Sequence, residues 1–392
     1  MRKAVVRFVT VAGAVLAVWS AQAQQPVKIG VILPFSGQFA DGANQLDNGI
    51  KLYMKQHGDT AAGRKIEVIR RDTGGVAPDV AKRLAQELIV RDNVDILAGF
   101  LLTPNAMATG PVSEEAKKFM VVMLAATAII TTKSPYMVRT SLTIPQNVEA
   151  LGAWAHRSGI KKAYTMVSDY GPGHDAEMSF QRAFKEGGGE IVGSVRFPVN
   201  IPDFAPYLQR AKDANPEAIF VFVPGGTQPG LFGKALKDVG IDPQKIKVLG
   251  QGEITDDNAL ASMREAALGI ITSFHYDPNH DSKMNKEFVK DYRDAYGRNP
   301  DFFTVGGYDG MHLIYEALKK TGGKTDVDSL VAAAKGMKWE SPRGPISIDP
   351  ETRDVIQTIY IRRVEKVGGE LRNVEFEKIE NVKDPVKARM KN

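Results

Sequence analysis

The chain has 392 residues, of which 43% are hydrophobic and 25% are charged, with a formal net charge of +5. It contains no cysteine, so neither disulfide bonds nor a thiol nucleophile takes part in its structure or chemistry. Three of the positive charges, Arg2, Lys3 and Arg7, lie at the extreme N-terminus, and the small remaining excess excludes a nucleic-acid-binding surface. The length is sufficient for about two domains with their own hydrophobic cores.

The first 23 residues have the pattern of a signal peptide. A positively charged start is followed by the apolar run FVTVAGAVLAVW and then by Ala21-Gln22-Ala23, which is typical of a cleavage site. The apolar run is short compared with the roughly 20 residues of a membrane-spanning helix, which argues against the alternative of an N-terminal anchor. We therefore expect residues 1–23 to be removed. Because no cysteine follows to carry a lipid, the mature protein should be free in the periplasm, without membrane insertion.

Short apolar runs alternate with helical patterns in the first half of the chain. Buried parallel strands are predicted at 27–33, 65–71, 94–100 and 119–124. Between the second and third, Val80, Leu84 and Leu88 recur at helical spacing. This alternation is typical of an open parallel sheet covered by helices on both faces.

The same order of elements then begins again. Strands are predicted at 162–168, 190–197, 217–223 and 245–250, helices at about 280–296 and 304–320, and late strands at 344–349 and 355–367. The tail KDPVKARMKN (383–392) is interpreted as a loose, solvated terminus.

We therefore predict an α/β fold with two doubly wound parallel-sheet lobes joined by a multi-strand hinge, with chain crossings near 141–146, 271–278 and 336–345. The N-terminal lobe is expected to comprise 24–143 and 277–337, and the C-terminal lobe 144–276 and 338–392.

Ligands of such sheets bind beyond the carboxyl ends of the strands, close to helix N-termini. In the first half these loops carry hydroxyl groups and small residues, as in Phe35-Ser36-Gly37 and in the segments after residues 100 and 124. In the second half they carry an aromatic residue, glycines and a carboxylate. Hydroxyl groups and free backbone N–H groups suit a small carboxylate, although each such residue alone could equally be a helix cap.

Other motifs point to no reaction. The segment GPGHDA (171–176) lacks the acidic residue that a dinucleotide site needs about 20 residues later. In FHYDPNHD (274–281) the clustered His and Asp residues are better explained by a turn and a helix start than by a metal site. Hydrolase signatures are missing from the sequence. We expect no enzymatic activity, no cofactor and no metal.

Several segments together resemble one family. KIGVILPFSG, ATA at 126–128, SDYGPG at 168–173, DFAPYLQRAKDANPEAIFV at 203–221 and YDG at 308–310 resemble the leucine/isoleucine/valine-binding type of periplasmic protein, a type I substrate-binding protein of ABC importers. The resemblance extends over nearly all of 26–370. It implies a bilobal closing cleft and, as partners, a small carboxylate ligand and a cognate permease and ATPase, with the binding protein acting as a monomer.

The resemblance also implies roles for individual residues. Thr103, Ala126 and Thr127 would hold the ligand carboxylate, Tyr170 would stack on or hydrogen-bond to the ligand, and Glu253 would face an amine. With the neighbouring loop positions, the predicted ligand-binding residues are Phe35, Ser36, Leu102, Thr103, Ala126, Thr127, Tyr170, Gly225 and Glu253.

One departure from the family pattern leaves the ligand open. Amino-acid binders have Gly-Pro-Glu-Gly where this chain has Gly250-Gln251-Gly252-Glu253, so Glu253 is shifted by one residue. A branched-chain amino acid is the first hypothesis, and an aromatic, benzoate-type acid that needs no amine partner is the alternative. A periplasmic sensor that reports to a membrane receptor would have the same features.

Overall fold

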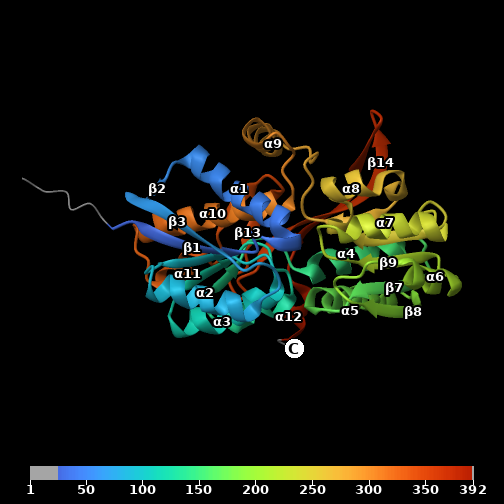
Figure 1. The fold of residues 1–392 in the computed structure, drawn as a ribbon, viewed down its shortest axis with the longest axis horizontal. Coiled ribbons are helices and arrows are strands. Elements are labelled where there is room, and N and C mark those ends of the chain that lie inside the picture. The colour runs from blue at the N-terminus through green and yellow to red at the C-terminus, as the bar shows by residue number, and fades with distance from the viewer. Residues whose placement is uncertain (1–24, 391–392) are drawn as a thin grey trace, which may run out of the picture.

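The computed structural model describes residues 25–390, so the predicted signal peptide at 1–23 lies outside the described residues. Two sheets, each with helices on both faces, form two lobes that lie side by side along the long axis of the molecule (Figure 1). The predicted fold class, two mainly parallel α/β lobes, is confirmed.

The first lobe, called the N-lobe below, is built on a six-stranded sheet in the order β2-β3-β1-β4-β5-β6. All its neighbouring strands are parallel except β2 and β3. The strands are β1 (Val27–Leu33), β2 (Thr60–Ala61), β3 (Arg64–Asp72), β4 (Ile96–Gly99), β5 (Phe119–Val122) and β6 (Met137–Arg139). The helices are η1 (Gly37–Phe39), α1 (Ala40–His57), α2 (Pro78–Val90), α3 (Thr103–Glu115) and η2 (Ala128–Lys133).

Three later helices return to this lobe, namely α9 (Lys283–Tyr296), α10 (Phe302–Thr321) and α11 (Val327–Ala334). Helix α10 packs closely on α1, and two glycines permit the approach. A Cβ atom on Gly49 would lie 2.0 Å from the Thr304 carbonyl oxygen, and one on Gly307 would lie 2.0 Å from that of Leu46. This packing places the first turn of α10 beside the loop that follows β1.

The second lobe, called the C-lobe, contains the strand order β12-β13-β14-β11-β10-β9-β7-β8, with β15 paired to β14. Strands β7 to β11 pair in parallel, whereas β12 to β15 add antiparallel pairs. The strands are β7 (Lys162–Ser168), β8 (Glu190–Phe197), β9 (Ala218–Phe222), β10 (Lys247–Gln251), β11 (Ile271–Phe274), β12 (Lys338–Ser341), β13 (Gly344–Ile348), β14 (Val355–Val367) and β15 (Glu370–Val382). The helices are α4 (Ile144–Arg157), α5 (Gly171–Glu186), α6 (Ala205–Asp213), α7 (Gln228–Val239), η3 (Gly252–Thr255), α8 (Asp257–Met263), η4 (Arg264–Ala267) and α12 (Pro385–Met390).

The interpretation of 383–392 as a loose, solvated terminus was wrong for its described part. Residues Pro385–Met390 form α12, which lies at the junction of the lobes (Figure 1). Lys387 is only 6% exposed and donates to the Oγ1 atom of Thr131, 2.7 Å away, and to Asp354. The charged residues of this segment suggested that it is solvated. Lys387 is buried nevertheless, because the buried carboxylate of Asp354 compensates its charge.

Candidate functional site

A cavity of about 280 Å³ lies between the two lobes, at the carboxyl ends of the strands of both sheets. Its walls contain apolar and aromatic side chains with a few polar groups, which is the usual composition of a small-molecule site. The lining residues are Gln38, Phe39, Asp41, Gly42, Leu101, Leu102, Thr103, Leu124, Ala126, Ile144 and Phe303 from the N-lobe and the start of α4, and Tyr170, Pro172, Phe222, Pro224, Gly225, Gly226, Thr227, Glu253, Asp256 and Asn258 from the C-lobe.

The loop after β4 supplies hydrogen-bond donors at one end of the cavity. Phe100 has a positive φ of 63°, a conformation that costs a non-glycine residue energy and that turns the chain sharply toward the cleft. Thr103 then begins α3, whose first N–H groups have no partner within the helix. The Thr103 Oγ1 atom lies 3.0 Å from that of Thr127, so each hydroxyl orients the other.

The loop after β5 forms the adjacent wall. Within residues 25–390, the backbone N–H groups of Ala126 and Thr127 have no hydrogen-bond partner. The carbonyl groups of Ala125 and Thr127 both accept hydrogen bonds from the Arg139 guanidinium group, at 3.1 and 2.7 Å. Because C=O and N–H point in opposite directions across a trans peptide, binding of the Ala125 carbonyl directs the Ala126 N–H away from Arg139.

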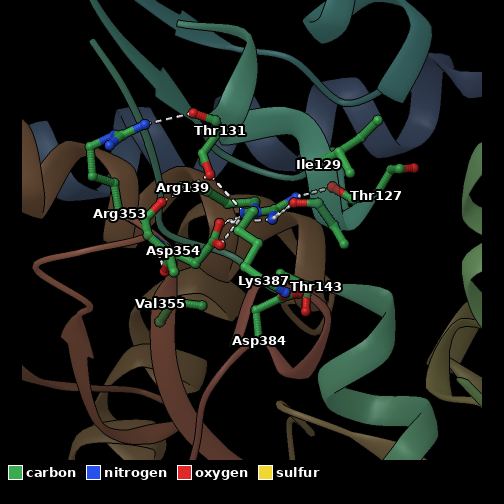
Figure 2. Close-up of polar contacts among 12 residues, drawn as sticks. Thr127, Ile129, Thr131, Arg139, Thr143, Arg353, Asp354, Val355, Asp384 and Lys387 are labelled. Atoms are coloured by element: carbon green, nitrogen blue, oxygen red, sulfur yellow. Dashed lines mark hydrogen bonds and ion pairs between the residues drawn. The ribbon is translucent and has the colours of Figure 1, made fainter. Parts of the chain in front are cut away.

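Arg139 is itself held in a buried cluster of charges at the junction of the lobes (Figure 2). Its guanidinium group contacts Oδ1 of Asp354 at 2.7 Å, and Lys387 of α12 binds the other oxygen of the same carboxylate. Arg353, next in the chain to Asp354, donates to the Thr131 carbonyl at 2.7 Å. Side chains from the C-terminal part of the chain thus hold the loop after β5.

Tyr170 covers the cavity from the C-lobe. It precedes α5, and its ring packs on Phe222 with centroids 6.3 Å apart. Burial raises the pKa of its hydroxyl well above the ordinary value, and the nearby Glu253 adds to the shift. A Cβ atom on the next residue, Gly171, would lie 3.1 Å from Thr127 Oγ1, so this loop faces the Thr103–Thr127 pair.

Glu253 lies on the part of the cavity wall formed by the loops after β9 and β10, close enough to Tyr170 to affect its pKa. Its Oε2 atom accepts a hydrogen bond from the Gly225 N–H at 3.0 Å, and Gly225 in turn faces the ring of Phe303. Burial raises the pKa of Glu253 to about 7, with a further contribution from Asp256, against the opposing effects of Gly225 and Gln251. Burial also raises the pKa of Asp256 to about 6. This end of the cavity is acidic.

The cavity therefore has two chemically different ends. Each end is formed by loops from both lobes. The loops after β4, β5 and β7 meet around Thr103, Thr127 and Gly171. The loops after β1, β9 and β10 meet around Glu253, where a Cβ atom on Gly226 would lie 3.4 Å from the Gln38 carbonyl oxygen. The first group is called the donor end below, and the second group, with Asp256, is called the acidic end.

Six of the nine predicted residues line the cavity: Leu102, Thr103, Ala126, Tyr170, Gly225 and Glu253. The other three lie beside it. Thr127 is 5% exposed and is hydrogen-bonded to Thr103. The Ser36 N–H donates to Asp72 Oδ1 at 3.3 Å, and a Cβ atom on Gly37 would meet the Gly74 carbonyl oxygen at 2.9 Å, so the Phe35–Gly37 turn packs on the loop after β3.

Sequence reasoning missed several lining residues. Phe39 follows the expected turn by only two residues, and Phe222 is the last residue but one of the strand predicted at 217–223, so both lie next to segments that the sequence analysis had singled out. Phe303 is far in the sequence from the segments that contain Phe39 and Phe222. It reaches the cavity only because α10 packs on α1. No local signal marks such a residue.

Polar contacts join the two lobes at the mouth of the cavity. Asn258 of the C-lobe donates to Asp41 Oδ2 at 3.3 Å and accepts from Arg298 Nη2 at 2.8 Å. Asn299 donates to Asp257 Oδ2 at 2.7 Å. Deeper in the cleft, the Ala128 N–H donates to Asp175 Oδ2 at 2.7 Å. The structure is therefore that of a closed cleft.

Comparison with known proteins agrees with this geometry. Residues 26–369 match the model of a family described as periplasmic binding protein. This chain belongs to that family. It is 46% identical over 363 residues to the Leu/Ile/Val-binding protein homolog 6 of Brucella abortus (strain 2308), covering 92% of this chain and 93% of that protein. The predicted relationship to leucine/isoleucine/valine-binding proteins is thus confirmed.

Two similar solved structures are solute-binding proteins of ABC transporters. One, from Rhodopseudomonas palustris BisB5 in complex with 3,4-dihydroxybenzoic acid, is 57% identical, with a TM-score of 0.89 and coverage of 92% of this chain and 99% of that chain. The other, from R. palustris HaA2 in complex with p-hydroxybenzoic acid, is 43% identical, with a TM-score of 0.90 and coverage of 93% and 100%. The protein is the periplasmic binding protein of an ABC transporter.

Periplasmic binding proteins are transport proteins and do not form an enzyme class, and those of ABC transporters bring small ligands to a permease and its ATPase. Among residues 25–390, no helix is both long and apolar enough to cross a membrane.

Proposed function

We propose that this protein captures a small aromatic carboxylic acid of the benzoate type in the periplasm and presents it to its permease. The observation that carries the proposal is that the donor end of the cavity and Glu253 are held by different pairs of loops. In an α-amino acid the carboxylate and the ammonium group are on one carbon, so their partners must be neighbours. Here the carboxylate donors and the acidic side chain have different neighbours, around Thr127 and around Gly225.

A flat ring suits the space between the two ends. The side chains of Phe39, Tyr170, Phe222 and Phe303 line the cavity, and its volume of about 280 Å³ is at the small end of the range for ligand sites. The carboxylate would accept hydrogen bonds from Thr103 Oγ1 and from the N–H groups of Ala126 and the first turn of α3. The benzoate-type ligands of the two R. palustris proteins support this choice over a branched-chain amino acid.

The protein would act as a monomer, free in the periplasm after removal of residues 1–23, and would release its ligand chemically unchanged. Nothing in the cavity provides a nucleophile with an adjacent general base. This role is favoured over that of a receptor-coupled sensor by the transporter relatives.

Thermal unfolding of the mature protein with single ligands tests the proposal. A ligand at 100 times its Kd stabilises the folded state by about 2.7 kcal/mol, which raises the Tm measurably. Benzoate-type acids should raise the Tm, whereas leucine, isoleucine and valine at the same concentration should not. Stabilisation by the branched-chain amino acids alone would refute the proposal.

A further inference from the structure

The acidic end of the cavity contains a carboxylate, Glu253, that no positive charge compensates. Glu253 Oε2 accepts from the Gly225 N–H and the side chain of Gln251 also stabilises the carboxylate, but among residues 25–390 Glu253 has no ion pair with any basic side chain. The residues lining the cavity include no lysine, arginine or histidine. A half-buried carboxylate without a positively charged partner favours a ligand that brings a hydrogen-bond donor.

The donor that fits is a neutral hydroxyl group on the ring. It must lie far from the ligand carboxylate, because that carboxylate binds at the opposite, donor end. An ammonium group on the carbon next to the carboxylate would lie beside the loops around Thr127, whereas Glu253 belongs to the loops around Gly225. A second carboxylate would meet Asp41, Glu253 and Asp256, which all line the cavity, and the like charges would repel it.

We propose that Glu253 is a specificity-determining residue, whose Oε1 atom accepts a hydrogen bond from a ring hydroxyl opposite the carboxylate, so that the protein selects 4-hydroxylated benzoates over benzoates without this group. The inference rests on the proposed function and adds to it the substituent that is recognised and the residue that recognises it. Burial raises the pKa of Glu253 despite its contacts with Gly225 and Gln251, as expected for a carboxylate without a positively charged partner.

The rival for this role is the Tyr170 hydroxyl. It also has no hydrogen-bond partner among the described residues, and the charge of Glu253 lies close enough to raise its pKa. However, the Tyr170 loop faces Thr103 and Thr127 at the donor end, whereas Glu253 is held by Gly225 at the other. Tyr170→Phe is therefore a matched control, because it removes one polar group from the cavity and keeps the ring.

Isothermal titration calorimetry of the mature protein with 4-hydroxybenzoate, 4-methylbenzoate and terephthalate tests the inference. The methyl group has the size of the hydroxyl group but cannot donate, and terephthalate places a carboxylate there. The wild-type protein should bind 4-hydroxybenzoate about 10- to 100-fold more tightly than 4-methylbenzoate and should bind terephthalate weakly. Equal affinities for 4-hydroxybenzoate and 4-methylbenzoate would overturn the inference without use of any variant.

Glu253→Gln retains an oxygen for the Gly225 N–H while it removes the charge. It should reduce the preference for 4-hydroxybenzoate by about tenfold and increase the affinity for terephthalate, a gain that mere structural damage would not produce. Tyr170→Phe should leave the preference nearly unchanged. Loss of the preference in Tyr170→Phe but not in Glu253→Gln would overturn the assignment to Glu253. Failure of every aromatic acid to bind would overturn the proposed function itself, and this inference with it.

Discussion

The Arg139 guanidinium group donates to the Thr127 carbonyl oxygen at 2.7 Å (Figure 2). Through the same group it binds Asp354, which precedes β14 of the C-lobe. Arg139 does not line the cavity, yet it determines which way the peptide groups of the binding loop point. If the proposed carboxylate binds at this loop, Arg139 is a positioning residue for it.

Arg139→Lys should weaken binding of benzoate-type acids by about 1–3 kcal/mol, because an ammonium group cannot replace the planar fork that holds three carbonyl groups and a carboxylate at once. Calorimetry measures the affinity, and the Tm of the ligand-free variant reports its folding. Lys387→Met is the control, since Lys387 contacts Asp354 and Thr131 but not the loop carbonyl groups. It should lower the Tm with little effect on affinity. Equal losses of affinity in the two variants would contradict a specific role for Arg139.

The two threonines of the donor end should differ in importance. Thr103→Val removes a hydroxyl group from the cavity wall and should cost about 1–3 kcal/mol of binding free energy. Thr127→Val leaves the wall intact and removes only the hydrogen bond that orients Thr103, so its effect on affinity should be smaller. Both affinities can be measured with one ligand. A larger loss in Thr127→Val would mean that Thr127, and not Thr103, contacts the carboxylate.

Tyr170→Ala should weaken ligand binding and leave the ligand-free Tm nearly unchanged. The ring is half-buried and packs on Phe222 at the cavity wall, so its removal enlarges the cavity without opening the core of the C-lobe. Differential scanning calorimetry with and without ligand separates the two effects. A drop in the Tm of the ligand-free variant as large as that of a core deletion would show that Tyr170 is structural.

The polar contacts at the mouth should slow ligand release. In the double variant Asn258→Ala/Asn299→Ala the closed cleft loses its bonds to Asp41, Arg298 and Asp257. Exposed contacts of this kind contribute about 0–1 kcal/mol each, so the dissociation rate should rise several-fold, as stopped-flow fluorescence would detect. Gln209→Ala, which breaks an exposed bond within α6, is the control and should leave this rate unchanged. A dissociation rate that stays the same in the double variant would exclude a role for the mouth in closure.

Glu253 should make the stability of the ligand-free protein depend on pH. Its pKa is about 7 in the folded state against 4.5 for an unperturbed glutamate, so the folded state binds the proton more strongly than the unfolded state. The contribution of the Glu253 proton to the free energy of unfolding is therefore present at low pH and is lost as the pH rises from about 4.5 to about 7. The glutamine of Glu253→Gln does not titrate, so the variant does not lose stability in this way. The Tm of the variant minus that of the wild type should therefore increase as the pH rises across that range. A constant difference between the two proteins would show that the pKa is not raised.

Much of the fold could be predicted because its strands are buried on both sides and therefore leave continuous apolar runs. The ranges predicted for β1, β7, β8 and β14 agree with the structure residue for residue. Strand β15 was not predicted. Charged residues interrupt its sequence because it pairs only with β14, and much of its length is exposed. The pairing of β15 depends on β14 and not on an apolar pattern in its own sequence.

The sequence by itself determined the two-lobed α/β architecture, the family and the loops that meet in the cleft, since each depends on local hydrophobic patterns or on ordered motifs. Tertiary structure alone decided which loop residues face the cavity, because Thr103 and Thr127 have the same chemistry and differ only in orientation. It alone also brought Arg139 to Asp354 and Lys387, and Glu253 to Gly225. Such contacts join segments far apart in the chain. A charged residue is buried only where a distant partner compensates its desolvation, and no local pattern records that partner.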